Sequence, residues 1–190
     1  MKLSFIFALV CSVFLLVACA PTDDSDGWID LSGSLDPWDQ IGDANWRIED
    51  GLFVADSGNG HLVTKDSFTN FQIQLEFWTN AGANSGVFIR AQEPDNITDK
   101  NCYEVNIFDT RPDQTYRTGG IVHFAAPSEI INTPNHWNTY DITANGDALT
   151  IVLNGITTAD IKDSTFSSGP FTLQYGAGVV KFRNIRVRNL

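Results

Sequence analysis

The chain has 190 residues, of which 43% are hydrophobic and 12% are aromatic, so it is long enough to form one domain with a full core. Its formal net charge is −11 at pH 7, and nucleic acids and anionic membrane surfaces both require a basic patch that so acidic a chain lacks. We therefore expect neither as a partner. A cleft for neutral sugars is compatible with this charge, although the charge alone does not select one.

The N-terminus is typical of a bacterial lipoprotein signal peptide. Lys2 precedes an apolar run over residues 3–17, which has the length of a signal-peptide core. The run ends in the sequence LVAC (16–19), which resembles a lipobox, in which the cysteine is lipidated and becomes the first mature residue. An ordinary secretory signal cleaved nearby is the alternative. A transmembrane helix is disfavoured because the run is short and polar residues follow it.

These features divide the chain into three parts. We expect residues 1–18 to be a signal peptide, residues 19–26 to be a tether with a lipidated Cys19, and residues 27–190 to form the domain. Ala20 stands where inner-membrane lipoproteins typically carry aspartate, so the resemblance suggests an outer-membrane protein of the cell envelope. The lipid would hold a soluble domain at the membrane without any spanning element. The oligomeric state stays open.

The three cysteines leave no partner for a disulfide within the domain. Cys11 lies in the signal peptide and Cys19 would carry the lipid, so Cys102 is alone. No neighbouring motif supports a nucleophile, and we expect Cys102 to be a small packed thiol.

Short alternating segments predict β-strands along the whole domain. The clearest covers residues 70–78, where Phe71, Ile73, Leu75 and Phe77 alternate with Gln72, Gln74, Glu76 and Trp78. The other predicted strands are residues 28–31, 46–54 (two strands joined at Asp50-Gly51), 61–64, 84–90, 102–109, 120–124, 137–143, 148–153, 170–175 and 179–187. Residues 33–45, 92–101 and 110–120 read as loops. With no amphipathic helix of ordinary length, the pattern predicts an all-β sandwich or barrel.

Two central segments, residues 84–90 and 102–109, carry the most chemistry. In the first, Phe88 and Arg90 would share one face; in the second, Glu104 and Asn106 would point away from the apolar side chains. A sheet face that carries charged, amide and aromatic groups suits a sugar-binding cleft. A half-solvated sheet whose charges simply meet water is the alternative.

A wider set of polar residues is a candidate for catalysis or binding: Glu76, Trp78, Arg90, Glu104, Asn106, Asp109, His123 and Gln174. Two carboxylates can divide acid and base roles in glycoside cleavage, and Arg90 could hold a carboxylate or a substrate oxygen. Trp78 or Phe88 could stack on a sugar ring. The alternatives are that His123 is a core histidine and that Glu104 forms a structural salt bridge with Arg90. A divalent metal site at His123 with carboxylates also stays open, and no cofactor is certain.

Several segments, taken in order, resemble the 3-keto-disaccharide hydrolase domain family, which was long a domain of unknown function. They are GW (27–28), WRIEDG (46–51), LVT (62–64), FQIQLEF (71–77), NSGVFIR (84–90), YEVNIFD (103–109), TGGI (118–121), WNTY (137–140), LNG (153–155) and FRNIRV (182–187). Each segment is weak by itself, but the ordered set is fairly specific and spans nearly all of the domain.

The resemblance implies a concanavalin A-like jelly roll, that is, two antiparallel sheets with a concave binding face. It also implies cleavage of glycosides oxidised at carbon 3, by hydrolysis or by elimination followed by hydration. A ketone at carbon 3 acidifies the hydrogen on carbon 2, so one base can begin the reaction. Glu104 or His123 would transfer the proton, Arg90 would orient the sugar, and Asp109 would be a ligand or support another group. Trp78, Asn84, Phe88, Asn106, Tyr116 and Gln174 would bind the substrate.

The chain departs from the family at three positions. Asn106 stands where the family often has glutamine, His123 replaces a non-histidine residue, and Tyr175 follows Gln174 where the family often has histidine. The alternative function is a non-catalytic carbohydrate-binding lipoprotein of the envelope, since the same sandwich also serves lectins. A purely structural envelope protein is a third hypothesis.

Overall fold

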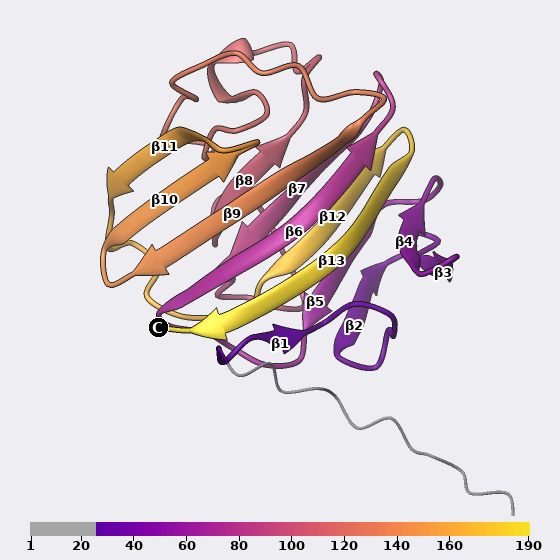
Figure 1. The fold of residues 1–190 in the computed structure, drawn as a ribbon, viewed down its shortest axis with the longest axis horizontal. Coiled ribbons are helices and arrows are strands. Elements are labelled where there is room, and N and C mark those ends of the chain that lie inside the picture. Colours follow the sequence, from indigo (N-terminus) through magenta and orange to yellow (C-terminus); the bar gives the residue numbers. More distant parts are fainter. Residues whose placement is uncertain (1–25) are drawn as a thin grey trace, which may run out of the picture.

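The computed structural model describes residues 26–190, which form two antiparallel β-sheets packed face to face (Figure 1). The expected signal peptide, the lipid attachment at Cys19 and nearly all of the tether lie outside these residues. Among the described residues, no helix has the length and apolar character needed to cross a membrane. The only helical segment there is the short 3₁₀ helix η1 (Gln114–Tyr116).

Each sheet is antiparallel throughout, but the order of its strands differs strongly from their order in the sequence. Sheet A contains, in spatial order, β11 (Ile156–Lys162), β10 (Ala148–Leu153), β9 (Trp137–Asn145), β6 (Phe71–Thr79), β13 (Val180–Asn189), β4 (Leu52–Ala55) and β3 (Arg47–Glu49), and β1 (Ile29–Asp30) pairs with β13. Sheet B contains β2 (Trp38–Gly42), β5 (Gly60–Thr64), β12 (Thr172–Ala177), β7 (Asn84–Ile89) and β8 (Tyr103–Ile107). The predicted all-β sandwich is therefore confirmed.

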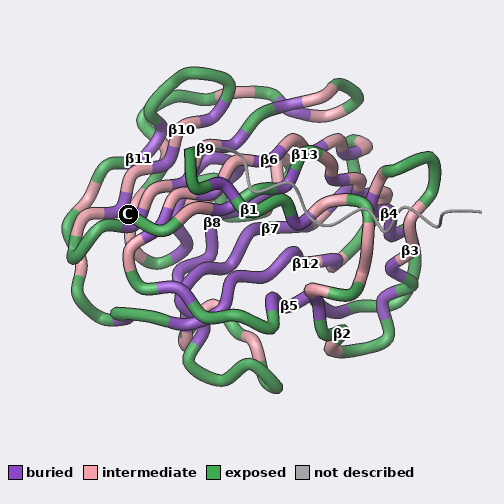
Figure 2. The backbone as a smooth tube through the Cα atoms, turned by 60° about the horizontal axis from the view of Figure 1, so that its bottom comes forward, coloured by how far each residue is buried: buried purple, intermediate pink, exposed green. Residues whose placement is uncertain are grey.

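Strand β6 explains how the layers are held together. Phe71, Ile73, Leu75 and Phe77 are at most 2% exposed and face sheet B, while the polar residues between them are half-buried on the outer face. Burying one such side chain contributes about 1.5–3 kcal/mol. Figure 2 shows the buried backbone concentrated in both sheets, with the exposed residues in the connecting loops.

Three predictions of local structure need correction. Residues 120–124 form turns joined by single bridges of Ile121 rather than a strand. Strand β2 lies within the segment expected to be a loop, and β11 was not predicted. The hairpin at Asp50-Gly51 is confirmed, because β3 and β4 pair directly and both turn residues have positive φ values of 50° and 78°.

Candidate functional site

Polar side chains line up in two rows across the outer face of sheet B. The register of the strands places His61, Gln174, Gly86 and Asn106 side by side in one row. The next row contains Val63, Thr172, Phe88 and Glu104. Each row draws on four strands that lie far apart in the sequence.

Gly86 stands in the middle of the first row, where neighbouring side chains pack directly against its backbone. A Cβ atom at this position would lie 3.0 Å from the Phe88 ring, 3.2 Å from the carbonyl oxygen of Val105 and 3.5 Å from Cγ of Glu104. The amides of Gln174 and Asn106 flank Gly86 and stand about 10 Å apart, which is two strand spacings. Oε1 of Gln174 and Oδ1 of Asn106 are buried and have no hydrogen-bond partner among residues 26–190. Buried polar atoms are rarely left unpaired, so these two oxygens are suited to bind a ligand or water.

Glu104 lies beside Gly86 on this face. It is 7% exposed, and no described residue forms a hydrogen bond with its carboxyl group. Burial raises the pKa of Glu104 to about 7; the negative charge of Asp99 adds to the rise, and Arg111 opposes it. A carboxyl group with a pKa of about 7 can accept and return a proton near neutral pH.

His61 forms the other side of the face. Its Nδ1 atom lies 2.9 Å from Oγ1 of Thr172, and its ring meets the Phe88 ring at right angles with centroids 4.9 Å apart. Burial lowers the pKa of His61 to about 4, so the imidazole is neutral at pH 7.

We expect this neutral histidine to make folding stability depend on pH. The unfolded chain takes up a proton on His61 as the pH falls from about 6.5 to about 4, but the folded chain does not, so stability falls over that window. Relative to His61→Gln, the wild type should lose about 3 kcal/mol of unfolding free energy between pH 7.5 and pH 4. Urea denaturation of both proteins at the two pH values measures this difference. A difference that does not change with pH would contradict the assignment.

His123 lies at the rim of the site rather than on the sheet face. Its Nε2 atom is 2.9 Å from Oδ2 of Asp99, and the His123 side chain is 47% exposed. The alternative that His123 is a core histidine is therefore wrong. Its neighbour Val122 donates a backbone hydrogen bond to the carbonyl of Glu104. A small cavity of about 350 Å³ opens here, lined by Asp99, Lys100, His123, Phe124, Thr165 and Phe166.

Arg90 does not lie on the expected polar face, and the expected pairing of Arg90 with Glu104 is wrong. Strand β7 ends at Ile89, and a φ of 55° at Arg90 turns the chain out of the strand pattern. The guanidinium is buried and donates to the backbone carbonyls of Thr69, Gly146 and Phe166 at 2.6–3.2 Å. It therefore joins three chain segments and leaves the outer face of sheet B without an arginine from this position.

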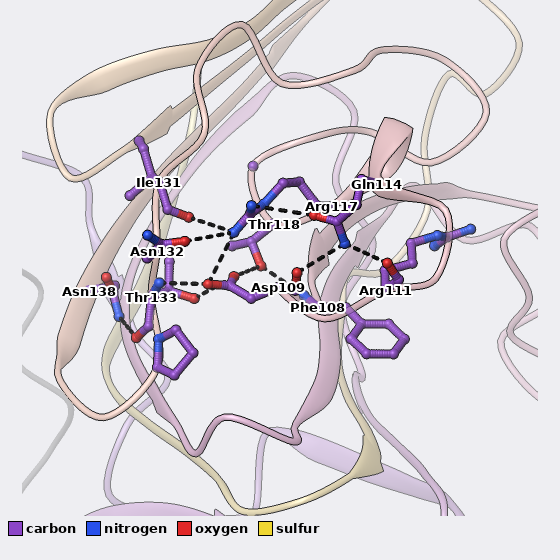
Figure 3. A network of polar contacts seen from close by, with 12 residues as sticks. Phe108, Asp109, Arg111, Gln114, Arg117, Thr118, Ile131, Asn132, Thr133 and Asn138 are labelled. Atoms are coloured by element: carbon purple, nitrogen blue, oxygen red, sulfur yellow. Dashed lines mark hydrogen bonds and ion pairs between the residues drawn. The ribbon is translucent and has the colours of Figure 1, made fainter.

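Asp109 belongs to a network of polar contacts that holds the loop after β8 (Figure 3). Its carboxylate accepts hydrogen bonds from the hydroxyl of Thr118 and from the backbone N–H and hydroxyl of Thr133, and Arg117 lies 3.3 Å away. The Asp109 and Arg117 side chains are at most 9% exposed. The expectation that Asp109 acts in catalysis or binds a ligand is not supported by this geometry, because its acceptor positions are already used.

Trp78 and Glu76 lie on the outer face of sheet A, on the opposite side of the sandwich from Glu104. Lys181 sits over the Trp78 ring at 5.1 Å, and Arg183 pairs with Glu76 at 2.7 Å. The expectation that these two residues share a cleft with Glu104 is therefore wrong. Alternation within one strand identifies a face, but it does not tell which sheet the strand joins.

The remaining expected binding residues lie near the site. Asn84 begins β7 and shares the outer face with Gly86 and Phe88. Tyr116 belongs to the covering loop; its carbonyl accepts a hydrogen bond from Nδ2 of Asn106, and its ring centroid lies 6.0 Å from that of His123. Phe88 is 2% exposed and belongs to the wall of the site.

Cys102 is confirmed as a packed thiol. It is fully buried, and its Sγ donates to the carbonyl of Thr98 at 2.8 Å. Burial raises its pKa, which keeps the thiol protonated.

The residues around Glu104 do not form an obvious metal centre. Within residues 26–190, no three histidine, cysteine or acidic side chains gather in a way that could hold an ion. Of the metal site expected at His123, the described residues contain one contact, that between His123 and Asp99.

The comparisons with known proteins identify the family. Residues 26–188 match the model of the 3-keto-alpha-glucoside-1,2-lyase-like domain. The chain belongs to this family. The match covers the whole sandwich, and the two rows of the candidate site lie within it.

Known relatives agree with a carbohydrate-related function. A 3-keto-disaccharide hydrolase from Bacteroides thetaiotaomicron is 31% identical over 85 residues, which are 37% of this chain and only 29% of that protein. A structure from Parabacteroides distasonis, described as a candidate glycosyl hydrolase, superposes with a TM-score of 0.69 at 22% identity and covers 80% of this chain and 99% of that one. The carbohydrate binding module CBM66 from Bacillus subtilis gives a TM-score of 0.65 at 18% identity, over 80% of this chain and 96% of the module. The two structural similarities concern the fold, a jelly-roll sandwich.

The structure adds three residues that were not expected at the site. His61 joins it because β5 pairs with β12, and this pairing has no local sequence signal. Asp99 and Arg111 act on the pKa of Glu104 from two separate loops. Only the alternation of His61 with the apolar Leu62 in a short strand could have indicated that His61 faces outward.

Proposed function

We propose that the chain cleaves glycosides already oxidised at carbon 3 and that Glu104 transfers the proton. The observation that carries this proposal is the buried Glu104 carboxyl group, which has a pKa raised to about 7 and no hydrogen bond to another described residue. It lies beside Gly86, on the same sheet face as two buried amide oxygens that have no partner among the described residues. Membership of the family supports the choice of substrate.

The reaction needs one base and groups that bind the developing negative charge. The Glu104 carboxylate removes the proton from carbon 2, and the electron pair of that bond forms an enolate with the carbon 3 ketone. The enolate then expels the glycosidic oxygen from carbon 1, which leaves as an alcohol after protonation. Water adds to carbon 1 and a proton returns to carbon 2, so the net change is hydrolysis.

The neighbouring side chains have matching roles. The Gln174 amide, which has no hydrogen-bonding partner among the described residues, can donate its N–H to the enolate oxygen or to a sugar hydroxyl. His123, which contacts Asp99 at the rim, would protonate the leaving oxygen. Neutral His61 completes the wall beside Phe88 without adding a charge that would stabilise ionised Glu104.

A substrate labelled with deuterium at carbon 2 tests this chemistry directly. We expect the purified domain to release both sugars from a 3-keto-disaccharide, more slowly when carbon 2 carries deuterium, and to leave the corresponding unoxidised disaccharide intact. Repeating the assay with EDTA and with added divalent metal tests metal dependence. Binding of sugars without release under either condition would favour the non-catalytic carbohydrate-binding alternative, which the similarity of the fold to a carbohydrate binding module supports.

We also propose that a lipid on Cys19 anchors the domain in the bacterial envelope, with the outer membrane as its place. The sequence LVAC at residues 16–19 supports this proposal. Incorporation of labelled palmitate into the chain, absent in Cys19→Ala, is the expected result; equal labelling of both would exclude the anchor.

A further inference from the structure

A cavity lies on the opposite side of the sandwich from Glu104. It has a volume of about 880 Å³ and opens on the outer face of sheet A, where β1 lies alongside β13 (Figure 1). This volume falls within the range of about 300–1,000 Å³ that is usual for small-molecule sites. Its lining consists of Trp28, Asp30, Ser32, Gln74, Leu75, Glu76, Thr139, Tyr140, Asp141, Val152, Gly155, Asn184 and Arg186.

The polar floor of this cavity, which we call the sheet A floor, consists of Gln74, Glu76, Asp141, Asn184 and Arg186, and its side chains hold one another in place. Arg186 donates to Oε1 of Gln74 at 2.7 and 3.0 Å, and Nε2 of Gln74 donates to Asp141 at 2.7 Å. Asn184 donates to Oε1 of Glu76 at 2.6 Å. Because these side chains are already ordered, binding a ligand costs little further side-chain entropy.

The wall formed by β1 is rigid for the same reason. The guanidinium groups of Arg186 and Arg188 lie over the ring of Trp28, at 4.6 and 4.7 Å from its centroid. Asp30 lies opposite Arg186 in the backbone pairing of β1 with β13. Its Oδ1 atom accepts a hydrogen bond from the backbone N–H of Ser32. Trp28 and Val152 contribute apolar surface to the opposite walls.

The remaining hydrogen-bonding capacity indicates the class of ligand. Oδ2 of Asp30 accepts no hydrogen bond from the described residues, and Oε1 of Glu76 and Oδ1 of Asp141 each accept only one. Nη1 of Arg186 donates to no described residue. Three carboxylates and one arginine in the lining disfavour an anion. Acceptors, one free donor and apolar walls together suit the neighbouring hydroxyl groups and ring faces of a neutral sugar.

We propose that this cavity is a second saccharide site, which binds a neutral oligosaccharide that need not be oxidised. Sheets that pack face to face lie about 10 Å apart, so the cavity and the Glu104 face point in opposite directions. A sugar in the sheet A cavity therefore cannot touch Glu104. Such a site would hold the domain on a glycan while the other face is free to act on a small substrate.

Filling the cavity tests the proposal. Val152 points outward from β10 into the cavity, whereas Thr150 points outward from the same strand but does not line it. We expect Val152→Trp to weaken binding of a neutral oligosaccharide by about tenfold or more, and the matched control Thr150→Trp to bind like the wild type. The probes are maltotetraose, cellotetraose and laminaritetraose, titrated into ¹⁵N-labelled protein and followed by NMR. Of the five tryptophan indole signals, we expect that of Trp28 to shift most, because it alone lines the cavity.

Two further experiments test this site independently of the proposed function. Glu104→Gln should bind the oligosaccharides with the same affinity as the wild type does. Loss of turnover in this variant therefore leaves the binding result unchanged. Heparin and spermine, an anionic and a cationic probe, should not compete with them. The proposal is overturned if none of the three tetrasaccharides shifts signals of sheet A, if Val152→Trp binds like Thr150→Trp, or if the shifts follow heparin or spermine instead.

Discussion

Glu104→Gln should lower kcat/KM for a 3-keto-disaccharide by about 10²–10⁴-fold, because a glutamine amide cannot accept the carbon 2 proton. In the wild type, kcat/KM should rise as the pH increases through about 7, since the carboxylate form is the base. Steady-state rates between pH 5 and pH 9 measure both effects. The control is Glu129→Gln, which removes the same charge from an exposed position in the nearby loop and should leave the rate unchanged.

The same substitution should stabilise the fold at high pH. Because the pKa of Glu104 is raised in the folded chain, ionisation costs stability as the pH rises from about 4.5 to about 7. Glutamine avoids this cost, so Glu104→Gln should be more stable than the wild type by about 3 kcal/mol at pH 8 and by much less at pH 4.5. Full activity of Glu104→Gln would remove Glu104 from the mechanism, and an unchanged stability at pH 8 would show that its carboxyl group is well solvated.

Arg90→Met should destabilise the domain by about 3–5 kcal/mol, because three backbone carbonyls lose a charged donor inside the protein. Urea denaturation at pH 7 measures the loss. Arg47→Met is the matched control, since Arg47 forms exposed ion pairs with Glu49 and Asp56 that contribute about 1 kcal/mol or less.

The result also separates a structural arginine from one that contacts substrate. At a temperature where Arg90→Met is fully folded, its KM for a 3-keto-disaccharide should stay within about threefold of the wild type. An unchanged stability together with a KM raised about tenfold would place Arg90 at the substrate and contradict the structure.

The alternation of polar and apolar residues along the sequence predicted most strands correctly. It could not predict which residues meet in the candidate site. Glu104 and Asn106 share a face because they alternate within one strand, and this relation is local. Glu76 and Trp78 obey the same rule in β6, yet β6 joins the other sheet through pairing with β9 and β13. Those pairings span more than 60 residues and depend on how the whole apolar core closes.

Arg90 illustrates a second limit. The segment NSGVFIR (84–90) reads as one strand, but the last residue has a positive φ that no sequence signal marks. Gln174 was correctly included in the candidate polar set, and the structure places it in the same row as Asn106. His61 was missed because its strand has five residues and all five are buried, which hides the alternation of polar and apolar side chains.

The network around Asp109 has a consequence for engineering. The Asp109 carboxylate, at the start of the segment between β8 and β9, binds Thr118 near the middle of that segment and Thr133 close to its end. The segment also carries Arg111, Tyr116 and His123, which border the Glu104 face. We expect residues 110–132 to be transferable from one relative to another as a single segment, provided that the graft keeps the hydroxyl donor at position 118 and the recipient keeps that of Thr133. Substrate preference would then be exchanged without rebuilding the β-sandwich beneath it.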